Sequence, residues 1–512
     1  MLLEFLVLLT IGTLLFYRWA TKNYEFFLKR NIAHDKPFFL LGSFKDMMLR
    51  RRNILEMVCD IHQRHNGIVY GIFDNRDPVL LIREPELIKR ILIKDHEHFF
   101  NRRRFLVGGQ ENIIANTIIM MENDRWRDMR STLSPAFTGS KMRQMFQLTL
   151  QCVDEAMSYL REQHVNAGAE GFELDVKDFT TRLTNDIIAS TAFGLQINSY
   201  RDRDNEFYSK ALKAINFSTL QYMKILFMML MPKVAEFFKF EFFDRSYTDY
   251  FMRLVLDAMK YRQEHNIHRP DMINLLMEAR GMIPSEAAKT HFRQWSDMEV
   301  VAQCFIFFLA GFDTSSSVMN FAAHELMENP QIQQRLYEEI SREDEELEGK
   351  SITYEALQRM PYLDMVVSEV LRKWPVALAV DRVCNKDYEY ESQATGERIE
   401  IKKGDMIRVA MGGIQRDAKY YENPEMFNPE RFSAENKSHI HAGIYMPFGL
   451  GPRNCIGNRF ALLEIKAFLY NVLRDYRLEA SAKTCTPLEL DKTTLQLRPK
   501  NGFWLQLKPR FA

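Results

Sequence analysis

The sequence of 512 residues predicts a mainly helical domain with a small β lobe, placed behind an N-terminal membrane anchor. Three observations favour this fold class: an apolar N-terminus, short β-like runs between helical patterns over residues 54–100, and a long apolar helical pattern over residues 300–330. No Pro/Ser/Gly-rich linker, charge run or internal repeat divides the remainder. We therefore expect an anchor with its basic flank over residues 1–30 and one large domain over residues 31–512.

The composition is that of a globular protein with an ample apolar interior. Hydrophobic residues make up 46% of the chain, and the 38 Phe and 28 Met suit both a core and an adaptable apolar pocket. The 68 basic and 68 acidic residues balance, so no basic field favours nucleic acid as a partner. The six cysteines are too scattered for a disulfide framework. We therefore place the large domain in a reducing compartment.

The N-terminal run MLLEFLVLLTIGTLLFY is apolar apart from Glu4 and a few hydroxyls. It is at the short end for crossing a bilayer, so a cleaved signal peptide is the alternative interpretation. No small-residue cleavage site follows it, whereas Arg18 and further basic residues do. Basic residues on this flank place the flank, and everything after it, in the cytosol. We therefore expect an uncleaved signal anchor, followed by a short connection that contains only Pro37.

Residues 54–100 predict the small β lobe. A helical pattern over residues 54–66 is followed by β-like runs at 68–73 and 78–82, and by a second helical pattern over 85–95. This amount of alternating structure is the size of a small mixed sheet with flanking helices.

Residues 216–243 are dense in Met and Phe and are broken at Pro232. Such a stripe is usually core. However, apolar side chains occur on all sides of the segment, and lysines punctuate it as they would at a lipid headgroup boundary. The residues alone leave both interpretations open.

Residues 300–330 predict a long apolar helix with polar groups at its middle, namely Gly311, Asp313 and Thr314. Buried polar groups are costly, so they need a purpose. A hydroxyl that bonds a helical carbonyl can open a local groove, and a neighbouring carboxylate can hold a water chain that delivers protons. A plain buried helix with a kink is the alternative.

Glu369 and Arg372 lie three residues apart on one face of a predicted helix that Pro375 ends. Most such pairs are exposed and contribute little to stability. The flanking residues are apolar, so we expect this pair to be buried and to have further partners.

Residues 448–457 read FGLGPRNCIG and present one thiol, Cys455, on a loop with three glycines. Glycine lets a backbone approach a flat partner where a Cβ would collide. A zinc or iron–sulfur site would need further ligands nearby, and the nearest other cysteine is Cys485. A single thiolate suits haem iron, and Arg453 can stabilise the thiolate or bind a haem propionate. A buried cysteine in a glycine-bearing turn is the alternative. The residues that follow have helical spacing.

This loop matches the haem-binding signature of the cytochrome P450 monooxygenases, Phe-x-x-Gly-x-Arg-x-Cys-x-Gly, at every fixed position. Residues 310–315, AGFDTS, resemble the oxygen-activation motif of the family. SEVLRKWP at 368–375 and NPERF at 428–432 resemble its Glu–Arg–Arg cluster, and DRWRDMR at 124–130 resembles its propionate-binding helix. These segments occur in the order of the family. The residues within these motifs are most similar to those of the microsomal group that contains insect detoxification enzymes and vertebrate drug-metabolising enzymes. Within this group, the insect branch is our first choice.

The resemblance implies a haem site. Cys455 is expected to be the axial ligand of the haem iron, because a thiolate pushes electron density toward O–O cleavage. Residues 376–387 are expected to run as a strand over the haem. The expected haem-binding residues are Arg102, Trp126, Arg130, Arg382, Arg453 and Cys455.

The resemblance also implies catalytic, pocket and structural residues. Thr314 is expected to stabilise activated oxygen and Asp313 to feed protons. The segment 106–119 is expected to be a mobile loop that lines the pocket, and the turn of a β-hairpin over residues 491–509 to lie near substrate. The expected pocket residues are Phe307, Phe308, Ala310, Val376, Ala377 and Leu378. The residues expected to hold the backbone of the ligand loop are Glu369, Arg372 and Arg431.

The implied fold is a helical triangular prism with a small β lobe, and the implied cofactor is haem b. The implied reaction is NADPH-dependent insertion of one oxygen atom from O₂ into lipophilic substrates, with xenobiotics such as plant toxins and insecticides as the first choice. NADPH-cytochrome P450 reductase would supply electrons, with cytochrome b5 as a second donor. The protein would lie in the endoplasmic reticulum membrane with its catalytic domain in the cytosol. The expected basic docking face for reductase comprises Arg127, Lys141, Arg143, Arg453, Arg459 and Lys466.

Three other functions remain open at this point. One is hydroxylation of an endogenous hormone or lipid. A second is a haem-thiolate isomerase or peroxygenase that needs no reductase; the Asp313–Thr314 pair argues against it, since that chemistry has no use for protons delivered to dioxygen. A third is a haem or lipid sensor without turnover.

Overall fold

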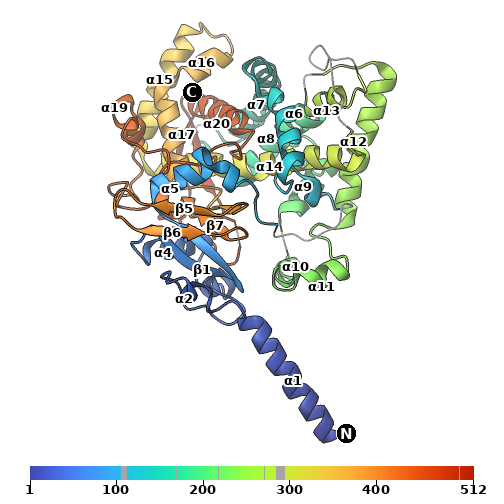
Figure 1. Cartoon of the computed structure of the whole chain (residues 1–512). Coiled ribbons are helices and arrows are strands. Elements are labelled where there is room, and N and C mark those ends of the chain that lie inside the picture. Colours follow the sequence, from blue (N-terminus) through green and yellow to red (C-terminus); the bar gives the residue numbers. More distant parts are fainter. Residues whose placement is uncertain are drawn as a thin grey trace.

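The computed structural model describes residues 1–104, 112–168, 170–216, 218–269, 271–283, 294–494 and 496–511. Helices dominate it, and the described strands form a four-stranded, a three-stranded and a two-stranded sheet (Figure 1). The mainly helical fold with a small β lobe, predicted from the sequence, is confirmed. The predicted pocket-lining loop at 106–119 lies in part outside the described residues.

The β lobe joins two segments that lie far apart in the sequence. Its four-stranded sheet has the order β1-β2-β7-β4, in which β2 and β7 are parallel and the other neighbours are antiparallel. Every residue of β1 is buried. The strands of the lobe are β1 (Val69–Asp74), β2 (Asp77–Ile82), β4 (Val380–Val383), β5 (Tyr388–Glu391), β6 (Arg398–Ile401) and β7 (Met406–Val409).

The helices of the lobe begin where the sequence predicts. A capping box between Asn53 and Glu56 starts α4 (Ile54–Gln63), and Pro85 starts α5 (Pro85–Lys89). The predicted pattern of helices and strands over residues 54–100 is confirmed.

The N-terminal helix α1 (Leu2–Thr21) projects from the molecule and is long and apolar enough to cross a membrane (Figure 1). The C-terminal end of α1 and the residues after it contact the β lobe. The Arg76 guanidinium stacks 3.4 Å over the Trp19 ring, and Phe27, in the short α2 (Phe26–Lys29), is 0% exposed in the core of the lobe. The flank of the predicted anchor therefore packs directly on the lobe.

The body of the protein is organised around α14 (Asp297–Glu328), the predicted long apolar helix. A capping box between Ser296 and Glu299 starts it, and most of its residues are buried. It packs against α8, α12, α17 and α20 and crosses the centre of the body in Figure 1. The other helices of the body are α6 (Asn123–Leu133), α7 (Gly139–Ala167), α8 (Val176–Ile188), α12 (Arg245–His265), α13 (Met272–Ala279), α15 (Pro330–Glu346), α16 (Tyr354–Gln358), α17 (Pro361–Lys373), α18 (Met411–Gln415), α19 (Ala434–Lys437) and α20 (Asn458–Asp475).

The Met- and Phe-rich segment forms the short helices α10 (Thr219–Leu230) and α11 (Pro232–Phe237), which follow α9 (Glu206–Ile215). Pro232 breaks the segment, as expected. Large apolar side chains remain exposed on it, for example Phe237 at 80% and Leu220 at 76%. In Figure 1 these helices lie at the lower edge of the body, and α1 projects from the molecule below the same edge. These exposed side chains exclude a fully buried core role for the segment.

The C-terminal segment differs from the predicted hairpin. The strand β9 (Trp504–Pro509) pairs with β8 (Tyr476–Ala480) and β3 (Phe172–Asp175) rather than with residues 491–498. The observed register places Leu505 and Leu507 against the apolar residues of two strands, which buries more apolar surface than a local hairpin would. A local loop is closed by a bridge between Leu490 and Pro499 and by backbone hydrogen bonds from the Asp491 amide to the Arg498 carbonyl and from the Lys500 amide to the Glu489 carbonyl.

Short turns complete the chain between these elements. They are α3 (Lys45–Met48), η1 (Arg90–Lys94), η2 (His96–His98), η3 (Ile114–Asn116), η4 (Ser134–Phe137), η5 (Ala189–Phe193) and η6 (Pro429–Phe432).

Candidate active site

The cysteine loop lies between the β lobe and α20 and is closed by its own backbone. The Cys455 amide donates to the Phe448 carbonyl at 2.8 Å. Gly451 has a φ of +70°, and a Cβ there would collide with the Leu92 carbonyl, so this glycine packs the loop on the lobe. Gly457 is different, because a Cβ on it would meet only a Phe137 ring atom at 3.8 Å. The loop is therefore anchored on one side and open on the other.

Cys455 faces an internal space. A solvent molecule can reach its side chain. The protein groups around it are nevertheless dense enough that burial raises the pKa of its thiol. The Gly457 amide and the charges of Arg130 and Arg102 act in the opposite direction. These two arginines, rather than the expected Arg453, are the cations that stabilise a thiolate here.

The three consecutive arginines at 102–104 have three different environments. Arg102 lies near Cys455: its Nη2 donates to the Arg453 carbonyl at 3.0 Å, and its buried Nε has no hydrogen-bond partner within the described residues. Arg103 donates to Asp74 at 2.7 Å in the β lobe. Arg104 is exposed. The run therefore contains one candidate haem contact, one structural ion pair and one surface residue.

Trp126 and Arg130 lie on one face of α6, as their spacing predicts. Arg130 donates from Nη1 to the Asn454 carbonyl at 3.0 Å and from Nη2 to Asn454 Oδ1 at 2.8 Å. The Arg453 guanidinium stacks 4.1 Å over the Trp126 ring and donates to the carbonyls of Phe100 and Met121, among others. Arg453 therefore fixes the ligand loop to the preceding segment, a role that favours positioning over a direct propionate contact.

Four guanidinium groups lie near one another at the cysteine loop: Arg102 and Arg130 act on Cys455, and Arg382 and Arg453 lie near Arg102. Among the described residues, no ion pair involves Arg102, Arg130, Arg382 or Arg453. Burial and the charge of Arg102 lower the pKa of Arg382 to about 9, and burial with the charges of Arg102 and Arg382 lowers the pKa of Arg453 to about 9. Buried like charges are costly unless an anion joins them. The two propionates of haem fit this requirement, and the thiol and the open glycine fit its iron and its flat face.

The middle of α14 faces the same kind of space. Ala310 and Thr314 are exposed, although most of the helix is buried. The Thr314 hydroxyl donates to the Ala310 carbonyl at 2.6 Å, which is the back-bond expected from the sequence. Helix α14 packs against α20, which directly follows the cysteine loop. Exposed groups on both sides of this contact outline an internal space between α14 and the loop.

Asp313 points away from this pair toward other cations. Its Oδ1 lies 3.4 Å from Lys177 Nζ on α8 and 3.7 Å from Arg498 Nη2 in the C-terminal segment. Burial lowers the pKa of Lys177, partly offset by Asp313. The carboxylate is thus held between two cations next to Thr314 in the chain.

The predicted pocket residues divide into two groups. Phe308 is 0% exposed and packs among aromatic rings, with its centroid 4.7 Å from that of Phe251, so its predicted contact with substrate is wrong. Phe307 is half-buried and stacks 5.5 Å from Phe137, which lies beside the cysteine loop. The pattern could not separate these neighbours, because adjacent residues on a helix point about 100° apart. Ala377 is exposed.

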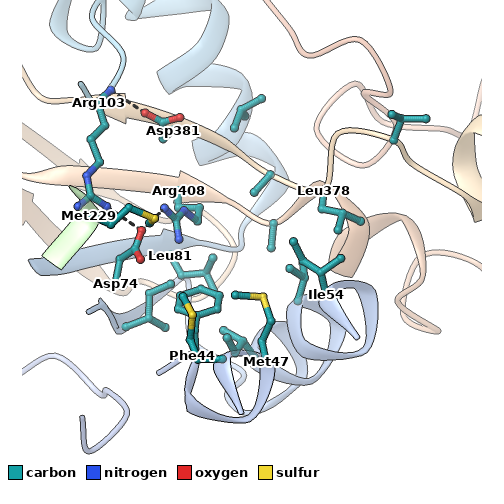
Figure 2. A pocket seen from close by; sticks show the side chains of 18 residues that line it. Phe44, Met47, Ile54, Asp74, Leu81, Arg103, Met229, Leu378, Asp381 and Arg408 are labelled. Carbon is teal, nitrogen blue, oxygen red and sulfur yellow. Dashed lines mark hydrogen bonds and ion pairs between the residues drawn. The ribbon is translucent and has the colours of Figure 1, made fainter. Parts of the chain in front are cut away.

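Val376 and Leu378 line a cavity of about 380 Å³ between the β lobe, α4 and α10 (Figure 2). Figure 2 shows apolar side chains, including Phe44, Met47 and Ile54, at one end of this cavity. Charged side chains gather at the other end, where Asp74 accepts from both Arg103 and Arg408 at 2.7 Å. Cys455 and Thr314 do not line this cavity. It therefore lies beside the candidate haem site, with Met229 of α10 as part of its wall.

Glu369, Arg372 and Arg431 meet as expected. Glu369 and Arg372 are both 0% exposed and joined by two hydrogen bonds of 2.7 and 2.9 Å, and Arg431 Nε lies 3.5 Å from Glu369. Arg372 also donates to the carbonyls of Gln415 and Pro424. The cluster thus holds residues 415–431 rather than the ligand loop itself. Its link to the loop is indirect, because the Met446 amide, just before the loop, donates to Gln415 Oε1 at 3.1 Å.

The expected basic docking face is smaller than predicted. Arg453 is buried and bonded to carbonyls, and Lys466 is buried and paired with Asp364 at 2.5 Å. Both are therefore removed from the face. The remaining members, which reach the surface in whole or in part, are Arg127, Lys141, Arg143 and Arg459.

Comparison with known proteins agrees with this geometry. The family model described as Cytochrome P450 matches residues 33–506. The chain belongs to the cytochrome P450 family. It is 53% identical over 519 residues to "Probable cytochrome P450 9f2" of Drosophila melanogaster, with all of both chains covered. It is 42% identical to "Cytochrome P450 9b1" of the same species, over 99% of this chain and 98% of the other. It is 34% identical to "Cytochrome P450 3A11" of Mus musculus, over 100% and 97%.

The protein is therefore a cytochrome P450 monooxygenase, and the predicted resemblance to the insect and vertebrate microsomal group is confirmed. The family implies a haem cofactor, a redox partner and a small-molecule substrate. This P450 also contains functional candidates that sequence reasoning missed. Asn454 bonds Arg130, Arg498 approaches Asp313, and Glu464 on α20 is fully buried with both carboxyl oxygens unpaired among the described residues. Only Asn454, inside the signature, had a local signal.

Proposed function

We propose that this P450 uses NADPH, through a reductase, to insert one oxygen atom from O₂ into lipophilic foreign compounds, with Cys455 as the iron ligand. The observation that carries the proposal is the Cys455 thiol near four buried or half-buried arginines, none of which forms an ion pair with a carboxylate within the described part of the chain. Xenobiotics are the proposed substrates because the chain resembles insect P450 proteins over its whole length and pairs an apolar cavity with a Met-rich wall.

Each of the protein groups at the site has its own proposed role. Haem, when bound, would supply the activation of dioxygen at its iron. Arg102, Arg130 and Arg382 would hold its propionates. Thr314, exposed on α14, would position a proton-bearing group in the internal space, and Asp313 would pass protons toward it. One oxygen atom enters the substrate and the other leaves as water, so each turnover consumes two electrons and two protons.

We further propose that the enzyme lies on the cytosolic face of the endoplasmic reticulum membrane. Support comes from α1, which is apolar and unburied, and from the exposed apolar side chains of α10 and α11. We propose that α9, α10 and α11 together act as a lid over the site. Lipophilic substrates would enter past the lid from the bilayer, along the cavity that Met229 borders.

Reductase would dock near the cysteine loop, where Arg127, Lys141, Arg143 and Arg459 leave a reduced basic face. Cytochrome b5 is proposed as a second donor to the same face.

The proposal is tested by turnover in phospholipid vesicles with NADPH, purified reductase and a panel of lipophilic compounds. Oxygenated product that depends on both NADPH and reductase is expected. Thr314→Ala should lower product per NADPH and release more peroxide, because proton delivery fails while electron delivery continues. Product that forms equally well with a hydroperoxide alone, and never with NADPH, would favour the peroxygenase alternative and overturn the proposal.

A further inference from the structure

Arg498 connects the lid to α14. It lies in the C-terminal loop that the bridge between Leu490 and Pro499 closes. Its Nη1 donates to the Asn216 side-chain oxygen at 2.7 Å, and Asn216 is the residue that ends α9. Its Nη2 lies 3.7 Å from Oδ1 of Asp313. One guanidinium therefore touches the lid and approaches the carboxylate proposed to carry protons.

The Arg498 guanidinium uses only part of its hydrogen-bonding capacity among the described residues. Nε and Nη2 of Arg498 are buried and have no hydrogen-bond partner within the described residues. The distance of 3.7 Å to Asp313 is longer than a hydrogen bond. An unpaired buried donor costs about 1–3 kcal/mol, so Arg498 has a reason to move toward a carboxylate once it is free to do so. The hydrogen bond to Asn216 restrains the guanidinium from this movement.

Asp313 has one further cation on a different element. Lys177 Nζ lies 3.4 Å from the same carboxylate oxygen, and Lys177 belongs to α8, which is outside the lid. Lys177 therefore contacts Asp313 from an element that is not part of the lid. Of these two cations, Arg498 is the one that is also bonded to the lid.

A second contact fastens the same loop to the lid. The Tyr222 hydroxyl on α10 lies 3.3 Å from the Thr494 hydroxyl, four residues before Arg498. Movement of the lid would thus pull on the loop at two points. The coupling has a short physical path, from the lid through one side chain to α14.

We propose that Arg498 couples the position of the lid to proton delivery by Asp313. With the lid closed, Asn216 keeps Arg498 at 3.7 Å from Asp313, so that the carboxylate has only two long contacts, this one and the one of 3.4 Å to Lys177, and can turn toward Thr314. With the lid displaced, Arg498 loses Asn216, binds the Asp313 carboxylate and holds it out of use. Protons would then reach the site only after the lid has closed over substrate. This inference rests on the proposed function, and Arg498 acts in it as a positioning residue.

Three variants separate this coupling from a general structural effect. Asn216→Ala should free Arg498 to bind Asp313 and lower product per NADPH, by about fivefold if one hydrogen bond is lost. Arg498→Met removes the guanidinium that would bind Asp313. The double variant Asn216→Ala/Arg498→Met should therefore recover the product yield that Asn216→Ala loses. Lys500→Met is the matched control, because Lys500 is an exposed cation on the same loop that faces Glu489.

A measurement without turnover accompanies the assay. Hydrogen exchange at the end of α9 should rise in both Arg498→Met and Asn216→Ala, because each removes the same contact, and should stay unchanged in Lys500→Met. If the double variant forms as little product per NADPH as Asn216→Ala, Arg498 does not hold Asp313 away from Thr314 and the inference is overturned. If the exchange at α9 does not respond to either variant, the contact does not hold the lid, and the inference falls whether or not the NADPH reaction occurs.

Discussion

Replacing Glu464 by Gln is predicted to stabilise the protein by an amount that grows with pH. Glu464 lies on α20, is 0% exposed and has no hydrogen-bond partner for either carboxyl oxygen among the described residues. Burial raises the pKa of its carboxyl to about 8, and the nearby Ser315 hydroxyl lowers it only in part. The folded protein therefore holds a proton here that the unfolded chain, with its ordinary carboxyl pKa of 4.5, releases.

The sign and size follow from proton linkage. Between pH 4.5 and 8 the folded state binds more protons than the unfolded state, so the free energy of unfolding falls as pH rises. A shift of one pKa unit is worth about 1.4 kcal/mol, which gives a loss of roughly 3 to 4 kcal/mol between pH 5 and pH 8. Gln has no proton to lose and escapes this penalty.

The assay is chemical denaturation of the haem-containing protein at pH 5 and pH 8, with wild type, Glu464→Gln and the exposed control Glu435→Gln. The stability difference between Glu464→Gln and wild type should increase by roughly 3 to 4 kcal/mol from the lower to the higher pH. The control should track the wild type at both pH values. An equal difference at both pH values would refute the claim that Glu464 is neutral and buried in the folded protein.

Two further predictions concern arginines. Arg372→Ala should lower the free energy of unfolding by about 3–5 kcal/mol, measured by denaturant titration, because it leaves the Glu369 carboxylate buried and unpaired. Arg335→Ala, which breaks an exposed ion pair, should cost less than about 1 kcal/mol, and equal losses would contradict the burial argument. Arg102→Ala should lower the haem content of purified protein and speed haem transfer to apomyoglobin, whereas Arg104→Ala, next but one in the chain, should do neither.

The sequence predicted those parts of the fold and the site whose partners are local. The cysteine loop, the pair on α6 and the Glu369–Arg372 pair depend on spacings of a few residues, which helix geometry fixes. The apolar residues around Glu369 were sufficient to predict its burial.

The sequence could not predict contacts that depend on distant segments. Lys466 was expected on the surface, but Asp364 of α17 pairs with it and α20 is buried on that side. Arg498 has no neighbouring signal, since its partners Asn216 and Asp313 lie on other elements. The C-terminal strand β9 pairs with β8 rather than with residues 491–498. The apolar faces of β8 and β9 meet through the tertiary fold, which local sequence does not show.

The central claim is that Cys455 binds haem iron as a thiolate, and the carbon monoxide difference spectrum of the reduced protein tests it most directly. Wild type should give the Soret band at the wavelength that names the family, and Cys455→His should lose that band. A band typical of histidine-ligated haem in the wild type, or no bound haem at all, would contradict the assignment of Cys455 and the monooxygenase mechanism built on it.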